Sequence, residues 1–361
     1  MKRGLVVLDP SEIPPGELEG RVGALQDVLR ERGLAAALIY GDVFHSGDLT
    51  YLSNICIYWN EGVLAVPANG SPAMLMKLSP RVHPWMRMTS NLSDLRSGPN
   101  LAVLAGQYLK EQGASELGLV EMSWWPAQLV DELETQAGIR SILDLGSVVR
   151  ERRQQPSESE LELLSRGSGL TAQAVIEGMG QDLSNHERAG RAELVARLGG
   201  AEDVSVYCHH CGPDADTVEV ISEFRGFWTL AARVVGGAQT EWAGALATGY
   251  EAAASEIRPG VTIAQVASAV QGCLASTGLG WKVDLIQHTD IETEAGYRSI
   301  HEAAASVGEG SVAALRLELE LPDGSTAVLA DTYLIRGEDT EVLTSPLPGI
   351  VSGINAAEKS F

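Results

Sequence analysis

One seven-residue segment restricts the possible folds of this chain more than any other. From Leu315 to Leu321, leucine alternates strictly with Arg316, Glu318 and Glu320. Successive side chains of a β-strand point to opposite faces of the sheet. The alternation therefore predicts a strand that buries four leucines on one face and presents three charged residues on the other. Strands of this kind are typical of antiparallel sheets with one packed face and one polar face.

The charged face of this predicted strand has two open interpretations. The first is a solvated sheet face without function, which is common in antiparallel sheets. The second is a ligand site in which Arg316, Glu318 and Glu320 contact substrate, because carboxylates beside an arginine suit an ammonium or guanidinium group. The formal net charge of −22, from 26 Lys and Arg against 48 Asp and Glu, agrees with a cationic or zwitterionic substrate.

The first half of the chain alternates between helical and strand-like patterns. Apolar spacing predicts helices at 20–32, 101–112 and 126–136, and strands at 35–40, 62–67, 72–77 and 117–120. This alternation indicates an α/β domain. A polar segment around Pro156 follows it, so we expect two domains, one at 1–150 and one at 151–361.

The second half combines long helices with strands. Three pairs, Ser157 with Glu160, Ser184 with Glu187 and Thr262 with Gln265, have the spacing of a capping box, which predicts that a helix begins at each. Strand-like patterns occur at 204–207, 218–221 and 315–321. The second domain is therefore expected to be of the α+β class.

Composition disfavours several classes of protein. An excess of acidic residues repels nucleic acid and anionic membranes, so we expect neither as a partner. The longest uncharged stretch, 260–281, has apolar residues at helical spacing and predicts an amphipathic helix instead of a membrane span. The apolar run at 4–8 is too short for a signal peptide, and four cysteines are too few for a disulfide scaffold. We therefore expect a cytoplasmic protein with a small-molecule substrate.

Four segments in order resemble motifs of the creatinase and Xaa-Pro aminopeptidase superfamily, whose fold is called pita-bread. They are Pro-Ser-Glu-Ser-Glu-Leu at 156–161, Gly-Phe-Trp at 226–228 with Arg233, Arg-Pro-Gly-Val-Thr at 258–262, and Asp-Thr-Tyr-Leu-Ile at 331–335 with Glu-Val-Leu-Thr at 341–344. The resemblance spans nearly the whole chain. It implies an α/β N-terminal domain, an α+β pita-bread domain with a curved antiparallel sheet, and a homodimer in which one subunit's first domain covers the other's pocket.

The resemblance also implies a metal site that this chain has altered. Metallopeptidases of the superfamily hold two divalent ions with two Asp, one His and two Glu. At the matching positions this chain has Leu230, Ala330, Glu219, His288, and either Glu318 or Glu320. Leucine and alanine offer no lone pair, and two cations need clustered carboxylates. We therefore expect no metal ion and no other cofactor.

The segment Cys208-His209-His210-Cys211 follows a strand-like pattern, and we expect it where that strand opens into a loop. A zinc site would need a second ligand pair, and Cys56 and Cys273 are isolated in the sequence. A redox C-x-x-C motif is expected at a helix start, which this segment lacks. Two interpretations remain: His209 or His210 is a general base, or both are structural residues at a strand end.

The other candidate site residues come from the resemblance. His288 and His301 lie in a charged segment at 286–304, which by itself favours a solvated loop. The resemblance implies that both line the substrate pocket, where imidazoles can transfer protons. Glu219 lies on the predicted strand at 218–221 and is a candidate to point into the pocket. The resemblance places Arg233 near the pocket as a structural or substrate-contacting residue.

Together these features lead to one main hypothesis and two alternatives. The main hypothesis is a metal-independent, creatinase-like hydrolase that breaks a C–N bond in a small amino-acid-like or guanidino substrate by His and Glu acid–base chemistry. One alternative is a non-catalytic binding module with a pita-bread fold. The other is an Xaa-Pro peptidase with an atypical metal site.

Overall fold

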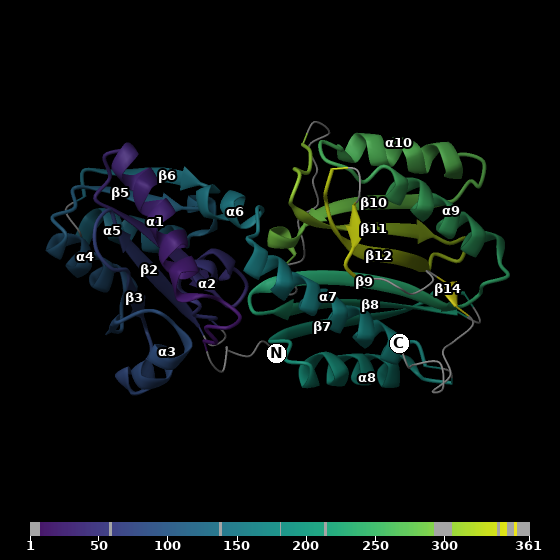
Figure 1. Ribbon diagram of the computed structural model, residues 1–361, viewed down its shortest axis with the longest axis horizontal. Helices are drawn as coiled ribbons and strands as arrows, with labels where there is room; N and C mark the ends of the chain where they lie inside the picture. Colours follow the sequence, from purple (N-terminus) through teal and green to yellow (C-terminus); the bar gives the residue numbers. More distant parts are fainter. Residues whose placement is uncertain are drawn as a thin grey trace. The chain divides into compact units, whose positions relative to one another are not determined.

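The computed structural model describes residues 8–57, 60–136, 139–180, 182–212, 215–291, 305–337, 340–344 and 350–351. The chain forms two compact units, one ending at Arg153 and the other beginning at Gln154 (Figure 1). The boundary predicted after residue 150 lies inside α6 (Val148–Arg153). Within the described residues, no helix has both the length and the apolar character needed to cross a membrane.

The N-terminal unit contains a mixed six-stranded sheet in the order β4-β3-β2-β1-β5-β6. Its strands are β1 (Ala36–Asp42), β2 (Glu61–Pro67), β3 (Ala73–Met76), β4 (Asp94–Ser97), β5 (Glu116–Val120) and β6 (Ser141–Gly146). Its other helices are α1 (Pro15–Glu31), α2 (Gly47–Ser53), α3 (His83–Thr89), α4 (Leu101–Glu111) and α5 (Ala127–Gln136), with 3₁₀ turns at Pro80–Val82 and Met122–Trp124.

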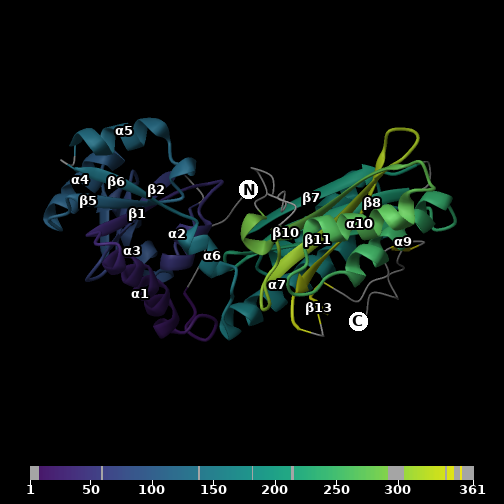
Figure 2. The same ribbon diagram turned by 90° about the horizontal axis from the view of Figure 1, so that it is seen from above.

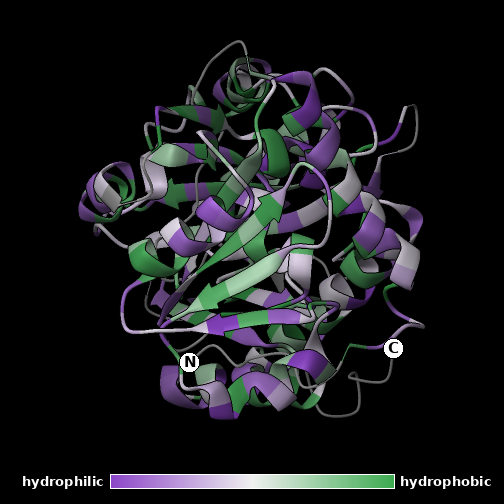
Figure 3. Cartoon of the chain, turned by 90° about the vertical axis from the view of Figure 1, so that its left-hand side faces the viewer, coloured by the Kyte–Doolittle hydropathy of each residue, from purple (hydrophilic) through white to green (hydrophobic). Residues whose placement is uncertain are grey.

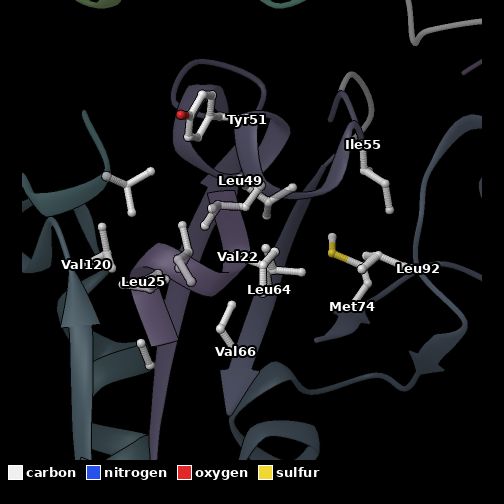
Figure 4. Packing of buried hydrophobic residues seen from close by; sticks show 14 of the residues in the cluster. Val22, Leu25, Leu49, Tyr51, Ile55, Leu64, Val66, Met74, Leu92 and Val120 are labelled. Atoms are coloured by element: carbon white, nitrogen blue, oxygen red, sulfur yellow. The ribbon is translucent and has the colours of Figure 1, made fainter. Parts of the chain in front are cut away.

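Helices cover both faces of this sheet, so the unit has the predicted α/β architecture. On one face, residues of α1 and α2 such as Val22, Leu25 and Leu49 pack against Leu64 and Val66 of β2 (Figure 4). On the other face, α4 and α5 form a second apolar cluster with alternate residues of the same strands. Alternation along each strand explains why one sheet supplies two separate apolar cores.

The C-terminal unit contains a larger sheet, in which six strands follow the order β10-β11-β12-β9-β8-β7. Neighbours along this order pair antiparallel. The strands are β7 (Asp203–His210), β8 (Ala215–Phe224), β9 (Phe227–Gly236), β10 (Gly280–Gln287), β11 (Val312–Glu320) and β12 (Thr326–Leu334). Two short strands, β13 (Glu341–Val342) and β14 (Ile350–Val351), pair with β12 and β9.

Four helices pack on one face of this sheet: α7 (Glu158–Gly178), α8 (Asn185–Leu198), α9 (Glu241–Ser255) and α10 (Ile263–Leu274). The first two cover β7, β8 and β9, and the last two cover β10, β11 and β12 (Figures 1 and 2). The capping boxes predicted for α7, α8 and α10 are all present. Hydropathy colouring shows long hydrophobic stretches on strands and mixed colours on helices, as expected for elements that surround a core (Figure 3).

The strand predicted from the leucine alternation is β11, and its two faces are as expected. Leu315, Leu317 and Leu319 belong to the apolar cluster under α9 and α10. Arg316 and Glu318 alternate with them and therefore point to the opposite face of the sheet. The predicted α+β class of this unit is confirmed.

A buried acid just before β7 makes the stability of this unit depend on pH. Burial raises the pKa of Glu202 to about 7 from 4.5, although Arg225 acts in the opposite direction. The folded protein therefore binds this proton more tightly than the unfolded chain, so stability falls as pH rises from about 4.5 to about 7. We expect the free energy of unfolding to decrease by about 2–3 kcal/mol across this range.

Urea denaturation at several pH values tests this expectation with the Glu202→Gln variant as the comparison. Glutamine keeps the size of the side chain but does not titrate, so the variant should lack this part of the pH dependence. Parallel curves for the wild type and the variant would contradict the assignment.

Candidate functional site

A row of side chains crosses the C-terminal sheet on the face opposite the four helices. The row is defined by residues paired directly across neighbouring strands. Its members, in the order of the strands, are Glu219 of β8, Ala232 of β9, Ala330 of β12, Arg316 of β11 and Asp284 of β10. Residues paired directly across antiparallel strands point to the same face. The row therefore brings together two acids, one arginine and two alanines from five strands.

Buried apolar side chains lie on the same face as this row and pack beside it. Leu230 lies two residues before Ala232 on β9, so both point to the same face. Together with Ala330 they belong to one buried cluster whose other members are Ile221, Trp228, Ile286, Ile291, Ala314 and Val328. The two positions that the resemblance relates to metal ligands, Leu230 and Ala330, thus lie on the same face as Glu219 and carry no donor atom.

The Arg316 guanidinium bridges two carboxylates, that of Glu219 in the row and that of Glu318 two residues further along β11. Its Nε atom lies 2.7 Å from Oε1 of Glu219, and its Nη2 atom lies 3.2 Å from Oε2 of the same carboxylate. Its Nη1 atom lies 2.8 Å from Oε2 of Glu318. Arg316 and Glu219 are buried, whereas the Glu318 side chain is 31% exposed. Charge-assisted, two-pronged contacts of this kind are among the strongest hydrogen bonds in proteins.

Two further charged residues, Lys282 and Asp284 of β10, lie beside Arg316, Glu219 and Glu318. These five residues form a charged array. Lys282 is paired across the strands with Glu318, and its Nζ atom lies 2.9 Å from Oδ2 of the buried Asp284. The Lys282 side chain is 59% exposed. Glu219, Glu318 and Asp284 together carry three formal negative charges against two positive charges on Arg316 and Lys282. The array therefore has a formal excess of negative charge, which favours a cationic group on a ligand.

The two neighbouring histidines of β7 point to opposite faces of the sheet. We expected the strand to open into a loop at Cys208, but pairing with β8 extends it through His210. Nε2 of His209 lies 3.9 Å from Oε2 of Glu219, and the imidazole is 38% exposed and stacked parallel to the ring of Tyr207. Nδ1 of His210 lies 2.6 Å from Oδ1 of Asp216 on the helix-covered face, and the side chain is 78% exposed.

The cysteines flanking these histidines have the character of structural residues. Burial raises the pKa of both Cys208 and Cys211 to about 11, so both are protonated thiols at neutral pH. Thiolates, not thiols, bind zinc and exchange disulfides. None of the four cysteines, Cys56, Cys208, Cys211 and Cys273, forms a disulfide.

Three further predicted residues, His288, Glu320 and Arg233, lie outside the central group or at its edge. His288 is buried in a 3₁₀ turn (His288–Asp290), with Nδ1 3.2 Å from the carbonyl oxygen of Val312. Glu320 is exposed at the end of β11, opposite Gly280. Arg233 points to the helix-covered face and pairs with Asp331. His301 lies outside the described residues.

The structure thus brings four of the predicted residues together, namely His209, Glu219, Arg316 and Glu318. It adds three that the sequence did not single out: Tyr207, Lys282 and Asp284. The last two carried a signal, because Lys282-Val283-Asp284-Leu285 alternates between charged and apolar residues as β11 does. Their importance depends on pairing with β11, which no local pattern reveals.

The donor atoms on this face do not fit the two divalent ions that the fold family implies. Leu230 and Ala330 have no donor atom, and the residue across from Ala330 is the cation Arg316, with Glu318 two residues further along β11. Both oxygens of Glu219 already accept hydrogen bonds from Arg316. Within the part of the chain that the structure describes, no group of three or more His, Cys, Asp or Glu could hold a metal ion.

Three solved structures that share this fold are peptidases by name. The prolidase from Pyrococcus horikoshii OT3 superposes with a TM-score of 0.72 at 17% identity, covering 90% of this chain and 98% of that chain. The X-Pro aminopeptidase from Thermotoga maritima MSB8 gives 0.76 at 16% identity, covering 91% and 98%. Dipeptidase PepE from Mycobacterium ulcerans gives 0.71 at 18% identity, covering 95% and 100%.

Sequence comparison alone finds no relative: no protein-family model and no curated protein matches this chain. The structural likeness nevertheless covers both units and nearly the full length of the compared proteins. The predicted pita-bread fold is therefore confirmed. At these identities the likeness shows the fold and leaves the chemistry to the residues on the sheet face.

Proposed function

We propose that this chain, which has the fold of prolidases and Xaa-Pro aminopeptidases, is a metal-independent, creatinase-like hydrolase that breaks a C–N bond in a small guanidino or amino-acid-like substrate. The observation that carries the proposal is the position of His209. Its imidazole is partly exposed, and Nε2 lies 3.9 Å from a Glu219 carboxylate that is itself held by Arg316. A histidine beside a fixed carboxylate is well suited to acid–base catalysis.

In the proposed reaction, His209 accepts a proton from a water molecule as the water oxygen bonds to the substrate carbon. The C–N bond of that carbon then breaks, and the proton passes from the imidazolium to the leaving nitrogen. Glu219 stabilises the imidazolium between these two steps because its negative charge lies close to the ring. A proton relay through His288 or His301, as the resemblance implies, is part of the proposal.

The charges around His209 support a cationic or zwitterionic substrate. Glu318 is partly exposed and uses Oε2 for Arg316, so we assign it to the ammonium or guanidinium end of the substrate. The exposed Lys282 beside it suits a substrate carboxylate.

One observation favours a second candidate, a non-catalytic binding module. Both oxygens of Glu219 accept hydrogen bonds from Arg316, which reduces the basicity available to His209 through this carboxylate. A chain with this arrangement can bind a zwitterionic ligand without turning it over. A peptidase with a single relocated metal ion is the third possibility, and the donor set on this sheet face argues against it.

Turnover with and without a chelator tests the proposed function. Guanidino acids, amino-acid amides and Xaa-Pro dipeptides are incubated with protein purified without chelators and with the same protein after EDTA dialysis. We expect release of urea or an amine from one substrate class at equal rates in both samples. Loss of turnover in EDTA and its return with Mn²⁺ or Co²⁺ would overturn the proposal. A ligand that raises Tm without turnover would favour the binding module.

We also propose that the protein is a cytoplasmic homodimer, as the resemblance and composition imply. The four cysteines form no disulfide, which agrees with a reducing compartment. Analytical ultracentrifugation measures the oligomeric state, and a monomer at micromolar concentration would contradict the dimer.

A further inference from the structure

We propose that the guanidinium of Arg316 is a built-in cation that replaces the divalent ions of the peptidases on this sheet face. It contacts both Glu219 and Glu318 and offsets one of their two negative charges, so these carboxylates have a cationic partner without a metal ion. This inference goes beyond the proposed reaction. It applies equally to an enzyme and to a binding module, because it concerns how the site balances its charge.

The first argument comes from strand register. Glu219 and Ala330 are two of the positions that the resemblance relates to metal ligands, and Arg316 is paired directly across from Ala330. Ala232 connects Ala330 to Glu219 in the same row. Arg316 therefore belongs to the same row as Ala330 and Glu219, and the observed strand register places its charge beside these two positions.

The second argument comes from the size of the residues between Arg316 and Glu219. Two strands, β12 and β9, separate β11 from β8, which corresponds to about 14 Å at the usual strand spacing. The long side chains of Arg316 and Glu219 nevertheless meet, and they do so above Ala330 and Ala232. A carboxylate-bearing residue at position 330 would project into the same space. The small side chain of Ala330 therefore leaves room for the contact between Arg316 and Glu219, which a carboxylate at position 330 would obstruct.

The third argument is the cost of burying charge. Glu219 is almost fully buried, and a buried carboxylate without a counter-charge strongly destabilises a fold. A guanidinium has a planar fork of donors, so one arginine contacts both oxygens of Glu219 and also Glu318. Lysine, with a compact ammonium group, could not make these separated contacts equally well.

Metal binding by an Arg316→Ala variant tests the inference without any assay of activity. Removing the guanidinium leaves Glu219 and Glu318 facing each other with His209 nearby. We expect this variant to have a lower Tm than the wild type. We also expect about 1 mM Mn²⁺ or Zn²⁺ to raise its Tm in a saturable way, while the wild type shows no shift under the same conditions. Methylguanidinium should likewise raise the Tm of the variant.

Two further variants make the comparison specific. The double variant Arg316→Ala with Glu219→Gln should lose the response to metal, because its main carboxylate is gone. The variant Arg188→Ala serves as a matched control, since Arg188 is also buried and binds Asp216, but on the helix-covered face. It should show a lower Tm without a response to metal. If Arg316→Ala fails to fold, Arg316→Gln provides the same comparison, because glutamine removes the charge but keeps a hydrogen-bond donor for the carboxylates.

The inference would be overturned by a stoichiometric divalent ion that a chelator removes from the wild-type protein with a fall in Tm. It would also be overturned if Arg316→Ala kept the wild-type Tm, or if its response to metal survived the Glu219→Gln change. Failure to find a substrate leaves these measurements unaffected. The test therefore separates this inference from the proposed hydrolase activity.

Discussion

In the His209→Ala variant, kcat for the proposed substrate is expected to fall by a factor of about 10² to 10⁴, the usual contribution of a general base. The imidazole is partly exposed and stacks on Tyr207, so its removal should leave the fold intact. Steady-state kinetics measures the effect, and thermal denaturation of the same sample checks that the variant is folded.

His210 provides the matched control, because it is the next residue on the same strand and points to the opposite face. Its imidazole contacts Asp216 and is largely exposed, so His210→Ala should leave kcat nearly unchanged. Glu219→Gln should also lower kcat, because the neutral amide no longer stabilises the imidazolium. Equal losses in the two histidine variants, or no loss in either, would remove His209 from the proposed role.

In the Arg233→Met variant, the free energy of unfolding is expected to fall by about 3–5 kcal/mol, because a buried carboxylate loses its counter-charge. Nη2 of Arg233 pairs with Oδ1 of Asp331, and Nη1 donates to the carbonyl oxygens of Ala232 and Ala330. Asp331 also accepts hydrogen bonds from the hydroxyls of Tyr250 and Thr344, at 2.9 and 2.8 Å. This network joins β9 to β12 at their single registered pair.

Urea denaturation measures this loss, and two variants serve as controls. Arg258→Met removes an exposed pair with Glu256 and should change the free energy of unfolding by less than about 1 kcal/mol. The double variant Arg233→Met with Asp331→Leu should recover part of the stability. Replacing both members of a buried ion pair by apolar residues is tolerated better than removing one member and leaving the other charge unpaired. A small effect of Arg233→Met alone would show that the network contributes little to the fold.

The network around Arg233 and Asp331 also explains why Arg233 and Arg316 should have different roles, although both lie on central strands of the sheet. Arg233 of β9 is paired with Val218 and points to the helix-covered face. There its contact with Asp331 links β9 to β12. Arg316 alternates with leucines that pack under the helices and therefore points to the other face. We accordingly expect changes at Arg233 to act through stability and changes at Arg316 to act through the charge of the site.

Several parts of this structure follow from short stretches of sequence. The alternation at 315–321 determines which residues of β11 are buried, because the period of a strand is two residues. The capping boxes at Ser157, Ser184 and Thr262 locate three helix starts, because they satisfy backbone groups within one turn. The sequence also shows that Leu230 and Ala330, which the resemblance relates to ligand positions, offer no donor atom to a metal ion.

The composition of the site was decided by tertiary structure. Glu219 and Arg316 are 97 residues apart in the chain, and they meet because β9 and β12 join two antiparallel groups of strands in one register. The extension of β7 through His210 likewise depends on pairing with β8, and it determines which histidine stands beside Glu219. Local sequence determines the face to which a side chain points, because that depends on neighbours along the strand. Its partners across the sheet depend on the alignment of distant strands, which only the folded chain establishes.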